Sequence, residues 1–256
     1  MSLKAILLST YSKNEKYIDP CISAIDILWP SHPKIWVISD RGNFKYKERV
    51  IVKNRNWANV MIGGIDSLLN THMLEIDDHV IMLLEDHTPI ETINEKWINS
   101  IMIYIGMEGL KYVNLSHHGQ GDKAGEIDGI YIYKIKDDFI YYSSFHPAIW
   151  NVGHLRNIMN QAILSNKPDP WHAEEVKIHN VIHYTAIIQN CDCIWPSSFS
   201  GFLKNRRANI EVLKNMKNPA LGDLRKILMR DWILAAPERM ARKLYHAFKD
   251  SLYTIY

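Results

Sequence analysis

Residues 80–90 have the sequence VIMLLEDHTPI, in which five apolar residues are followed at once by Glu85, Asp86 and His87. A short continuous apolar run that ends in polar residues and a proline predicts a strand buried on both faces of a sheet. Such a strand carries the three polar side chains to its carboxyl end. The other elements of the fold are therefore expected to assemble around this strand.

Similar apolar runs predict buried strands at residues 4–9, 34–39 and 111–115, in addition to the strand His79–Leu84. Apolar residues at helical spacing predict helices between them, at residues 17–28, 57–69 and 95–106. Strands that alternate with helices, and that are apolar throughout, are typical of an α/β fold with a doubly wound, mostly parallel sheet.

Polar side chains follow three of these strands. Thr10 and Ser12 come after the first strand, and Asp40 and Arg41 come after the second. Glu85, Asp86 and His87 follow the third. Because ligands of open α/β sheets bind beyond the carboxyl ends of the strands, these groups are expected to meet in one ligand site.

The second half of the chain has a different pattern. Alternation at residues 131–136, followed by the aromatic-rich residues 138–145, predicts a hairpin. Helices are expected at Val152–Leu164 and at residues 172–189. From residue 221 onward the sequence predicts basic helical segments that are interrupted at Pro237. We expect residues 1–200 to form the catalytic domain and residues 201–256 a helical C-terminal extension.

Charge is distributed unevenly along the chain. Residues 200–256 contain 12 basic and 5 acidic residues, whereas residues 1–199 contain 18 basic and 23 acidic ones. Near-neutrality overall gives no indication of a nucleic-acid-binding protein. The basic C-terminal helices combine apolar stripes with lysine and arginine, a pattern typical of contact with an anionic membrane surface. Packing on the body of the protein or on a second subunit is an equal alternative.

Three cysteines, Cys21, Cys191 and Cys193, are too few for a disulfide framework and indicate a reducing compartment. The apolar run near the N-terminus is too short for a signal peptide, and no stretch approaches the length of a membrane span. A cytoplasmic protein is expected, with a peripheral position on the inner face of the membrane as a further expectation.

The acidic strand end at Glu85 and Asp86 suggests divalent-metal chemistry. A metal ion held by a carboxylate can neutralise a departing diphosphate by acting as a Lewis acid. An acidic turn after a strand is also common without any metal, so the motif alone leaves both interpretations open.

A second motif begins at residues 144–151, SFHPAIWN, and continues about twenty residues later at residues 168–175, PDPWHAEE. It contains His146, Trp150 and Trp171, followed by Glu174 and Glu175. Tryptophan faces can pack against sugar rings, and a nearby carboxylate can accept a proton from an acceptor hydroxyl. Alternatively, both tryptophans are core residues and the acids are charges near a helix N-terminus.

Together, residues 80–86, 144–151 and 170–174 resemble, in the same order, three motifs of bacterial GT-A-like glycosyltransferases from polysaccharide loci of the capsule or O-antigen type. Asn56-Trp57, ahead of a predicted helix, fits the same pattern, and the resemblance covers residues 4–180. Two departures stand out: Glu85-Asp86 replaces a pair of aspartates, and His87 replaces an aromatic residue.

The resemblance implies a hexosyltransferase that uses a nucleotide-sugar donor and a divalent metal, manganese or magnesium, and a glycan or lipid-linked acceptor. Asp86 and His87 would hold the metal, and an inverting mechanism would use Glu174 as the base, with Glu175 as the second candidate. The expected donor-binding residues are Thr10, Ser12, Asp40, Glu85 and Asp86. The expected acceptor-binding residues are His146, Trp150 and Trp171.

Two other functions remain open on the sequence. A sugar-phosphate nucleotidyltransferase uses a similar sheet, but residues 10–16 lack the glycine-rich basic loop that such an enzyme carries after its first strand. A non-catalytic glycan- or nucleotide-binding relative would fit the altered Glu85-Asp86-His87 triplet. A zinc site built from His179, His183, Cys191 and Cys193 is a weaker alternative, because the spacing matches no familiar zinc module.

Overall fold

A computed structural model of the chain describes residues 2–10, 14–54, 56–116, 119–167, 169–178, 180–188, 193–196, 203–204, 207–208, 218 and 221–234. Within these ranges lies a nine-stranded sheet with the strand order β3-β2-β1-β4-β8-β5-β9-β7-β6. Its strands are β1 (Leu3–Ser9), β2 (Ile35–Ser39), β3 (Arg49–Ile51), β4 (His79–Leu84), β5 (Tyr112–Asn114), β6 (Gln120–Ile127), β7 (Ile130–Ile135), β8 (Ala148–Asn151) and β9 (Tyr184–Ile188).

The sheet is mostly parallel, as predicted. β1 pairs in parallel with β2 and β4, β2 with β3, and β5 with β9. β8 lies between β4 and β5 and is antiparallel to both, while β7 is antiparallel to β9 and β6. Seven of the nine strands therefore point in one direction, and only β7 and β8 oppose them.

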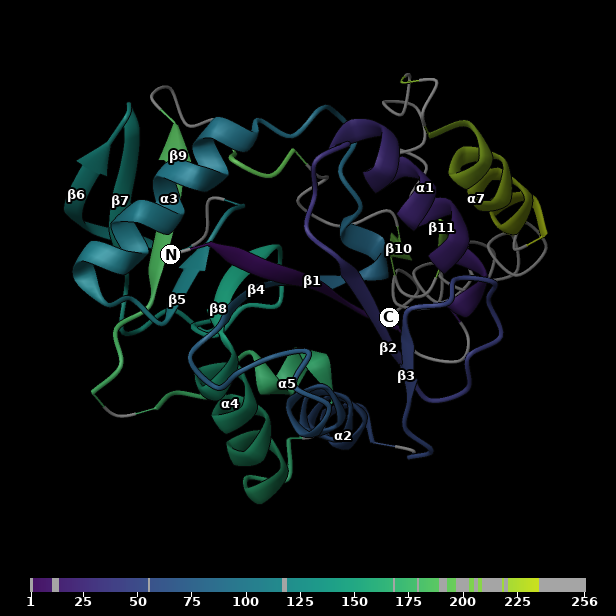
Figure 1. The fold of residues 1–256 in the computed structure, drawn as a ribbon, viewed down its shortest axis with the longest axis horizontal. Coiled ribbons are helices and arrows are strands. Elements are labelled where there is room, and N and C mark those ends of the chain that lie inside the picture. The colour runs from purple at the N-terminus through teal and green to yellow at the C-terminus, as the bar shows by residue number, and fades with distance from the viewer. Residues whose placement is uncertain are drawn as a thin grey trace, which may run out of the picture.

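Helices cover both faces of the sheet (Figure 1). One core cluster packs α1 (Ile18–Leu28) and α3 (Glu95–Glu108) on one face. The other packs α2 (Trp57–Asn70), α4 (Val152–Leu164) and α5 (Pro170–Ala173) on the opposite face. Ile6 and Leu8 of β1 belong to the first cluster and Leu7 to the second, as the alternation of side chains along a strand requires. Both faces of the central strands are thus buried, which explains their continuous apolar sequence.

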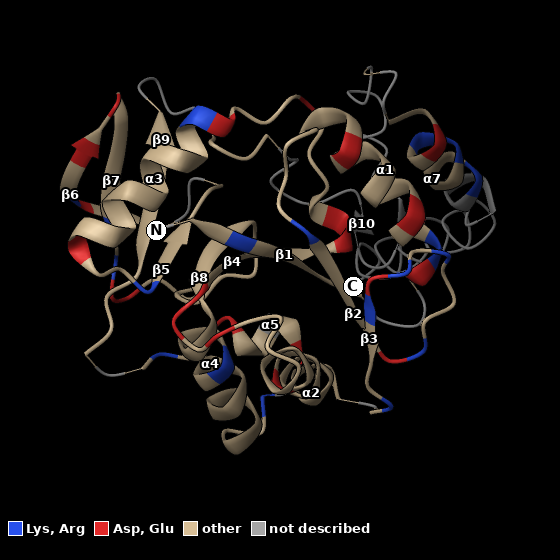
Figure 2. Cartoon of the chain, viewed as in Figure 1, with Lys and Arg blue, Asp and Glu red and all other residues tan. Residues whose placement is uncertain are grey.

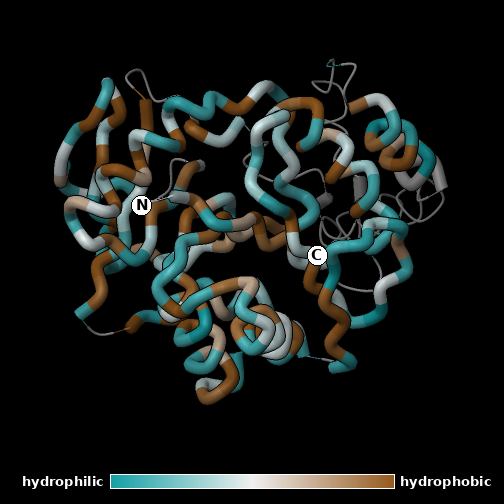
Figure 3. Tube along the Cα trace, viewed as in Figure 1, coloured by the Kyte–Doolittle hydropathy of each residue, from teal (hydrophilic) through white to brown (hydrophobic). Residues whose placement is uncertain are grey.

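Asparagines begin three of the helices. Side-chain oxygens of Asn56, Asn94 and Asn151 accept hydrogen bonds from backbone N–H groups in the first turns of α2, α3 and α4. Asparagine is among the preferred residues at this position because it satisfies N–H groups that have no partner within the helix. The helices are amphipathic, with hydrophobic and hydrophilic segments alternating along their coils (Figure 3).

The helix α7 (Gly222–Leu234) packs on α1. Leu221, Leu224 and Leu228 are buried against Tyr17, Cys21, Ala24 and Leu28. In Figure 2, α7 carries both basic and acidic residues along its ribbon. This contact favours the packed alternative for residues 221–228; the segment after Pro237 lies outside the described residues, so a membrane role for it stays a prediction. Among the described residues, no helix is both long enough and apolar enough to cross a bilayer.

Two predicted elements differ from the structure. The hairpin partner of β7 is β6, which precedes it, and residues 138–145 form no strand. β6 has the polar sequence QGDKAGEI and a largely exposed surface, so it carries no hydrophobic signal. The helix predicted at residues 172–189 is also wrong: α5 ends at Ala173, Asn180 adopts a left-handed φ of 65°, and Tyr184–Ile188 forms β9. The short strands Leu203–Lys204 and Arg207–Ala208, β10 and β11, pair separately.

Candidate active site at the carboxyl edge of the sheet

The polar residues that follow β1, β2 and β4 meet at one edge of the sheet. Ser9, the last residue of β1, is in register with Ile38 of β2 and with Leu84 of β4. Thr10 and Glu85, which come next in the chain, therefore lie at the same edge, together with Asp40. Thr10 is buried, and its Oγ1 has no hydrogen-bond partner among the described residues. Ser12 lies outside the described residues.

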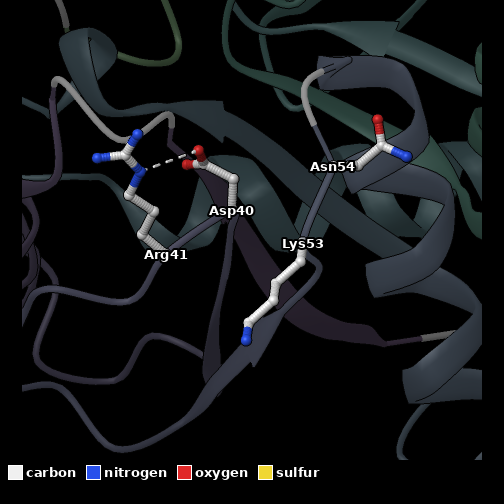
Figure 4. A pocket seen from close by; sticks show the side chains of 4 residues that line it. All are labelled: Asp40, Arg41, Lys53 and Asn54. Atoms are coloured by element: carbon white, nitrogen blue, oxygen red, sulfur yellow. Dashed lines mark ion pairs between the residues drawn. The ribbon is translucent and has the colours of Figure 1, made fainter.

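An open polar pocket of about 700 Å³ lies beside β2 and β3 (Figure 4). It is lined by Asp40, Arg41, Lys53 and Asn54. Asp40 Oδ2 lies 3.8 Å from Arg41 Nε, whereas Asp40 Oδ1 is buried and accepts no hydrogen bond from any described residue. The volume is within the range of small-molecule sites. Lys53 and Asn54 were not predicted, because they follow β3, a three-residue strand with an exposed sequence.

Glu85 and Asp86 form the short 3₁₀ turn η2 (Glu85–His87) at the end of β4. Glu85 is buried, and one of its oxygens accepts a hydrogen bond from the amide of Asn14. Burial, together with the neighbouring charge of Asp86, raises the pKa of Glu85 to about 8. Burial raises the pKa of Asp86 to about 7. In the part of the chain that the structure describes, neither carboxyl forms an ion pair with a lysine or arginine.

Two histidines stand next to these acids. His87 Nε2 lies 3.7 Å from Asp86 Oδ1, and the rings of His87 and His146 lie 4.4 Å apart between centroids. Burial and the proximity of His87 lower the pKa of His146 to about 3, so its imidazole is neutral at neutral pH. The strand end and the segment before β8, about 60 residues apart in sequence, therefore form one site.

Glu174 follows α5 and is buried against the same segment. Its Oε1 accepts hydrogen bonds from Phe145 N at 2.7 Å and from Ser144 Oγ at 3.3 Å. Its backbone carbonyl accepts a further bond from Ser143 N at 2.9 Å. Burial raises the pKa of Glu174 to about 7, and the charge of Asp86 contributes to the increase, so the two carboxyl groups share one electrostatic environment.

Glu175 is in a different environment from its neighbour. Its Oε2 lies 2.7 Å from Lys167 Nζ, and the hydrogen bond from Lys167 lowers the pKa of Glu175. It is therefore a partly exposed, ion-paired carboxylate outside the cluster that contains Asp86. The structure therefore separates the two candidate bases: Glu174 lies in the cluster that contains Asp86, and Glu175 does not.

The tryptophans of the second motif are not equivalent. Trp150 is fully buried in the core, in ring contact with Tyr112, Phe145 and His154. A side chain with no exposed surface cannot stack on an acceptor sugar, so the predicted acceptor-binding role of Trp150 is corrected to a role in packing. Trp171 belongs to α5, and the placement of its side chain is outside what the structure describes.

The predicted metal ligands come together only as a pair. Within the described ranges, no group of three or more histidine, cysteine, aspartate or glutamate side chains is arranged to hold a metal ion. The zinc alternative is not supported at His183, whose Nε2 lies 2.7 Å from His154 Nε2 in a buried hydrogen bond. His179 and Cys191 lie outside the described residues.

Comparison with known proteins identifies no family. No family model and no curated protein matches the chain. Among solved structures, 4-diphosphocytidyl-2C-methyl-D-erythritol synthase aligns with 11% identity and a TM-score of 0.45, over 85% of this chain and 100% of that one. An active-site mutant of LgtC aligns with 11% identity and a TM-score of 0.35, over 66% of this chain and 68% of that one. Similarities this distant carry no functional argument.

Proposed function

We propose that the chain is a glycosyltransferase that transfers a sugar from a nucleotide-sugar donor to a glycan or lipid-linked acceptor. The observation that carries this proposal is the proximity of three carboxyl groups with raised pKa values, the buried Glu85 and Glu174 and the partly buried Asp86, at the carboxyl edge of the sheet that also carries the open pocket lined by Asp40. The pocket suits a nucleoside, and the carboxyl cluster suits the reacting end of the donor. The motif resemblance to GT-A-like enzymes supports the same assignment.

Asp40 and Thr10 would recognise the nucleoside. Asp40 Oδ1 and Thr10 Oγ1 are both buried without hydrogen-bond partners among the described residues. Buried polar atoms in native proteins are nearly always paired, so the unpaired atoms of Asp40, which lines the pocket, and of Thr10, at the same edge of the sheet, would gain a partner from a bound ligand. Ribose and nucleobase groups supply hydrogen-bond donors of this kind, and the cationic Arg41 and Lys53 favour an anionic ligand in the same pocket.

A divalent cation fits the strand end. Adjacent ligands at about 2.1 Å from an octahedral ion lie about 3.0 Å apart, and Asp86 Oδ1 and His87 Nε2, now 3.7 Å apart, would reach that separation by a small side-chain rotation. Magnesium sites commonly use one or two protein groups and complete their coordination with phosphates and water. When bound, manganese or magnesium would act as a Lewis acid and neutralise the diphosphate that leaves. Asp86 and His87 would hold it, and the positive charge of the bound ion would favour the ionised form of Glu85 behind them.

Glu174 would accept the proton of the acceptor hydroxyl. Its Oε1 is fixed by Phe145 N and Ser144 Oγ, which leaves Oε2 to face the acceptor. A pKa of about 7 makes this carboxyl a stronger base than an exposed glutamate, and about half of the molecules carry it ionised at pH 7. In this inverting scheme, the acceptor oxygen attacks the anomeric carbon as the bond to the diphosphate breaks.

Product analysis separates this function from its alternatives. The protein is incubated with manganese and nucleotide sugars, or with nucleoside triphosphates and sugar 1-phosphates. Release of nucleoside diphosphate from a nucleotide sugar is expected. Release of pyrophosphate from a triphosphate would instead identify a nucleotidyltransferase. Binding of nucleotide sugars without either product would identify a non-catalytic relative and contradict the proposal.

We also propose a cytoplasmic enzyme of polysaccharide biosynthesis that contacts the inner face of the membrane through residues after Pro237. The basic, apolar-striped sequence of this segment supports the contact. Deleting residues 238–256 is expected to reduce sedimentation with anionic phosphatidylglycerol vesicles and to leave the thermal unfolding of the catalytic domain intact. Equal sedimentation before and after the deletion would contradict the membrane contact.

A further inference from the structure

Asn14 and Glu15 lie between the two halves of the candidate site. They occupy the start of the 3₁₀ turn η1 (Glu15–Tyr17), between β1 and α1. Asn14 and Glu15 form hydrogen bonds to different sides of the candidate site. Asn14 bonds to Glu85 at the end of β4, and Glu15 bonds to the loop that follows β2.

The Glu15 carboxylate is enclosed by that loop. Glu15 is 2% exposed, and it accepts hydrogen bonds from Ser39 Oγ, from Gly42 N at 2.6 Å and from Asn43 N at 3.0 Å. Burial alone would raise the pKa of Glu15, but these hydrogen bonds outweigh it and lower the pKa, so the group is a stable carboxylate. The loop that it fixes contains Asp40 and Arg41, which line the pocket.

Gly42 allows the loop to wrap around this carboxylate. Its φ is +84°, in the left-handed region, and a Cβ at this position would lie 2.6 Å from the side chain of Ile51. A residue other than glycine would be strained here and would meet β3. The backbone N–H of residue 42 is therefore directed at Glu15 by a conformation that glycine makes accessible.

The side chain of Asn14 also bonds to a residue of the candidate site and not to the backbone of its own turn. It occupies the N-cap position of η1, where asparagine side chains usually bond to the backbone of the following turn. No such capping bond forms; the amide donates to Glu85 Oε1 instead. The contact joins residues that are 71 positions apart in the sequence.

We infer that Asn14 and Glu15 are positioning residues that set the nucleoside pocket and the acidic strand end at a fixed separation. Glu15 fixes the loop after β2, which contains Asp40, and Asn14 fixes the side chain of Glu85 next to Asp86. Because Asn14 and Glu15 are adjacent in the chain, the loop after β2 and the end of β4 are expected to move together. This arrangement selects donors in which a diphosphate of fixed length separates the nucleoside from the sugar. The inference rests on the proposed function.

Isothermal titration of the full-length protein with uridine, cytidine, guanosine and adenosine diphosphates, each with manganese, tests the role of Glu15. Glu15→Gln directs an amide N–H at one of the loop donors and is expected to weaken diphosphate binding by about tenfold. Ser39→Ala removes one donor with little change in volume and is expected to weaken it by about threefold. Asp19→Asn is the matched control, expected to change affinity by less than about twofold.

Asp19 is a matched control because it is also a carboxylate that accepts backbone hydrogen bonds from the loop after β2, but at a position away from the pocket. Asp19 lies one helical turn after Glu15, and it accepts bonds from Lys45 N and Tyr46 N at 3.0–3.1 Å, in a part of the same loop that does not line the pocket. Equal weakening by Asp19→Asn and Glu15→Gln would show a general effect of the loop on stability and overturn the inference. Unchanged affinity in both Glu15→Gln and Ser39→Ala would also overturn it.

A double-mutant cycle tests Asn14. If Asn14 acts through Glu85, Asn14→Ala reduces kcat/KM of nucleotide-sugar turnover by about tenfold in the wild type and has no effect in Glu85→Ala. Additive losses would overturn the role of Asn14. A wild-type protein that binds none of the diphosphates overturns the proposed function and this inference together, whereas binding that is insensitive to Glu15 overturns the inference alone.

Discussion

Two regions of the molecule contain ionisable side chains with shifted pKa values: a group of acids in one region and a pair of histidines in the other. At the end of β4, Glu85 is buried and Asp86 is partly buried, and the buried Glu174 lies close enough for the charge of Asp86 to raise its pKa; none of the three forms an ion pair with a lysine or arginine among the described residues. Between α4 and β9, His154 and His183 are buried inside the protein and bond to each other. Burial moves the pKa of both sets toward the neutral form, upward for the acids and downward for the histidines.

The histidine pair is completely surrounded. His183 Nδ1 lies 2.8 Å from the carbonyl oxygen of Tyr142, and its ring is stacked between Tyr112 and Tyr142. A carbonyl only accepts, so His183 carries its proton on Nδ1, and its Nε2 must accept from His154 Nε2–H. Burial lowers the pKa of His154 to about 4 and that of His183 to about 3.

The contrast shows which buried groups indicate function. A shifted pKa occurs in both regions, so the shift alone does not locate a site. The difference lies in the partners: the two histidines hydrogen-bond to each other inside the protein, whereas the carboxyl groups lie at the carboxyl edge of the sheet without a lysine or arginine partner among the described residues. We expect the acids to serve ligand binding and catalysis, and the histidines to serve stability.

The largest effect is expected from Glu174→Gln. The amide keeps the size of the side chain and its bond from Phe145 N but removes the basic oxygen, so sugar transfer should fall by about 100- to 10,000-fold. Nucleoside diphosphate binding should remain. Steady-state kinetics and calorimetry measure the two quantities, and Glu175→Gln is the control with a far smaller loss. If Glu175→Gln is the inactive variant, the carboxyl cluster is not the catalytic centre.

Asp86→Asn should lower activity but raise thermal stability at pH 8. Loss of the carboxylate should reduce turnover by about 100-fold or more, since the diphosphate loses the stabilisation that a metal would bring. The folded pKa of about 7 lies above the unfolded value near 3.8, so Asp86 costs stability above about pH 4, and the cost grows until about pH 7. The Tm of the variant should therefore exceed that of the wild type by about 2–4 °C at pH 8 and by less at pH 4.5. A lower Tm at pH 8 would contradict the loss of stability assigned to this ionised carboxylate.

Trp150→Phe should affect stability without affecting turnover per folded molecule. Trp150 is fully buried, and its Nε1 has no hydrogen-bond partner among the described residues, so the change removes volume only. A loss of about 1–3 kcal/mol in the free energy of unfolding is expected in urea. An increase in KM for the acceptor in an otherwise stable variant would restore the acceptor-binding role that the burial of Trp150 argues against.

His154→Gln should give the smallest effect and the opposite dependence on pH from Asp86→Asn. Glutamine can still donate to His183 Nε2 but does not titrate in this range. The folded pKa of His154 is below its unfolded value near 6.5, so the stability that it contributes is complete above pH 6.5 and is lost as the pH falls toward 4. The variant should gain about 1–3 °C in Tm relative to the wild type between pH 8 and pH 5. A difference in Tm that does not vary with pH would contradict the assignment of a neutral buried pair.

The sheet edge could be predicted from the sequence, because strong local signals define it. Continuous apolar runs marked β1, β2 and β4 within one residue of their observed ends, and the polar residues that follow them include Asp40 and Asp86. The choice between Glu174 and Glu175 needed the structure. Adjacent carboxyls have the same local pattern, and only the contacts with Phe145 and Lys167 distinguish them.

The features that the sequence did not predict depend on contacts between segments that are distant in the chain. Trp150 resembles a binding aromatic in sequence, and only its place on β8, inserted antiparallel between β4 and β5, buries it. β6 is polar and exposed and gives no apolar pattern. Asn14 and Glu15 resemble ordinary residues of a turn, since their partners are 24 to 71 residues away. A single sequence contains no local signal for such long-range hydrogen bonds.

Diffraction at the manganese edge most directly tests the claim that the carboxyl edge of the sheet binds the nucleotide donor. Crystals would be grown with manganese and the nucleoside diphosphate that binds most tightly in calorimetry. We predict an anomalous peak within coordinating distance, about 2.0–2.3 Å, of an Asp86 oxygen. The nucleoside should occupy the pocket of Asp40, Arg41, Lys53 and Asn54. A nucleotide bound elsewhere on the protein, with Asp86 contacting neither metal nor phosphate, would contradict the account.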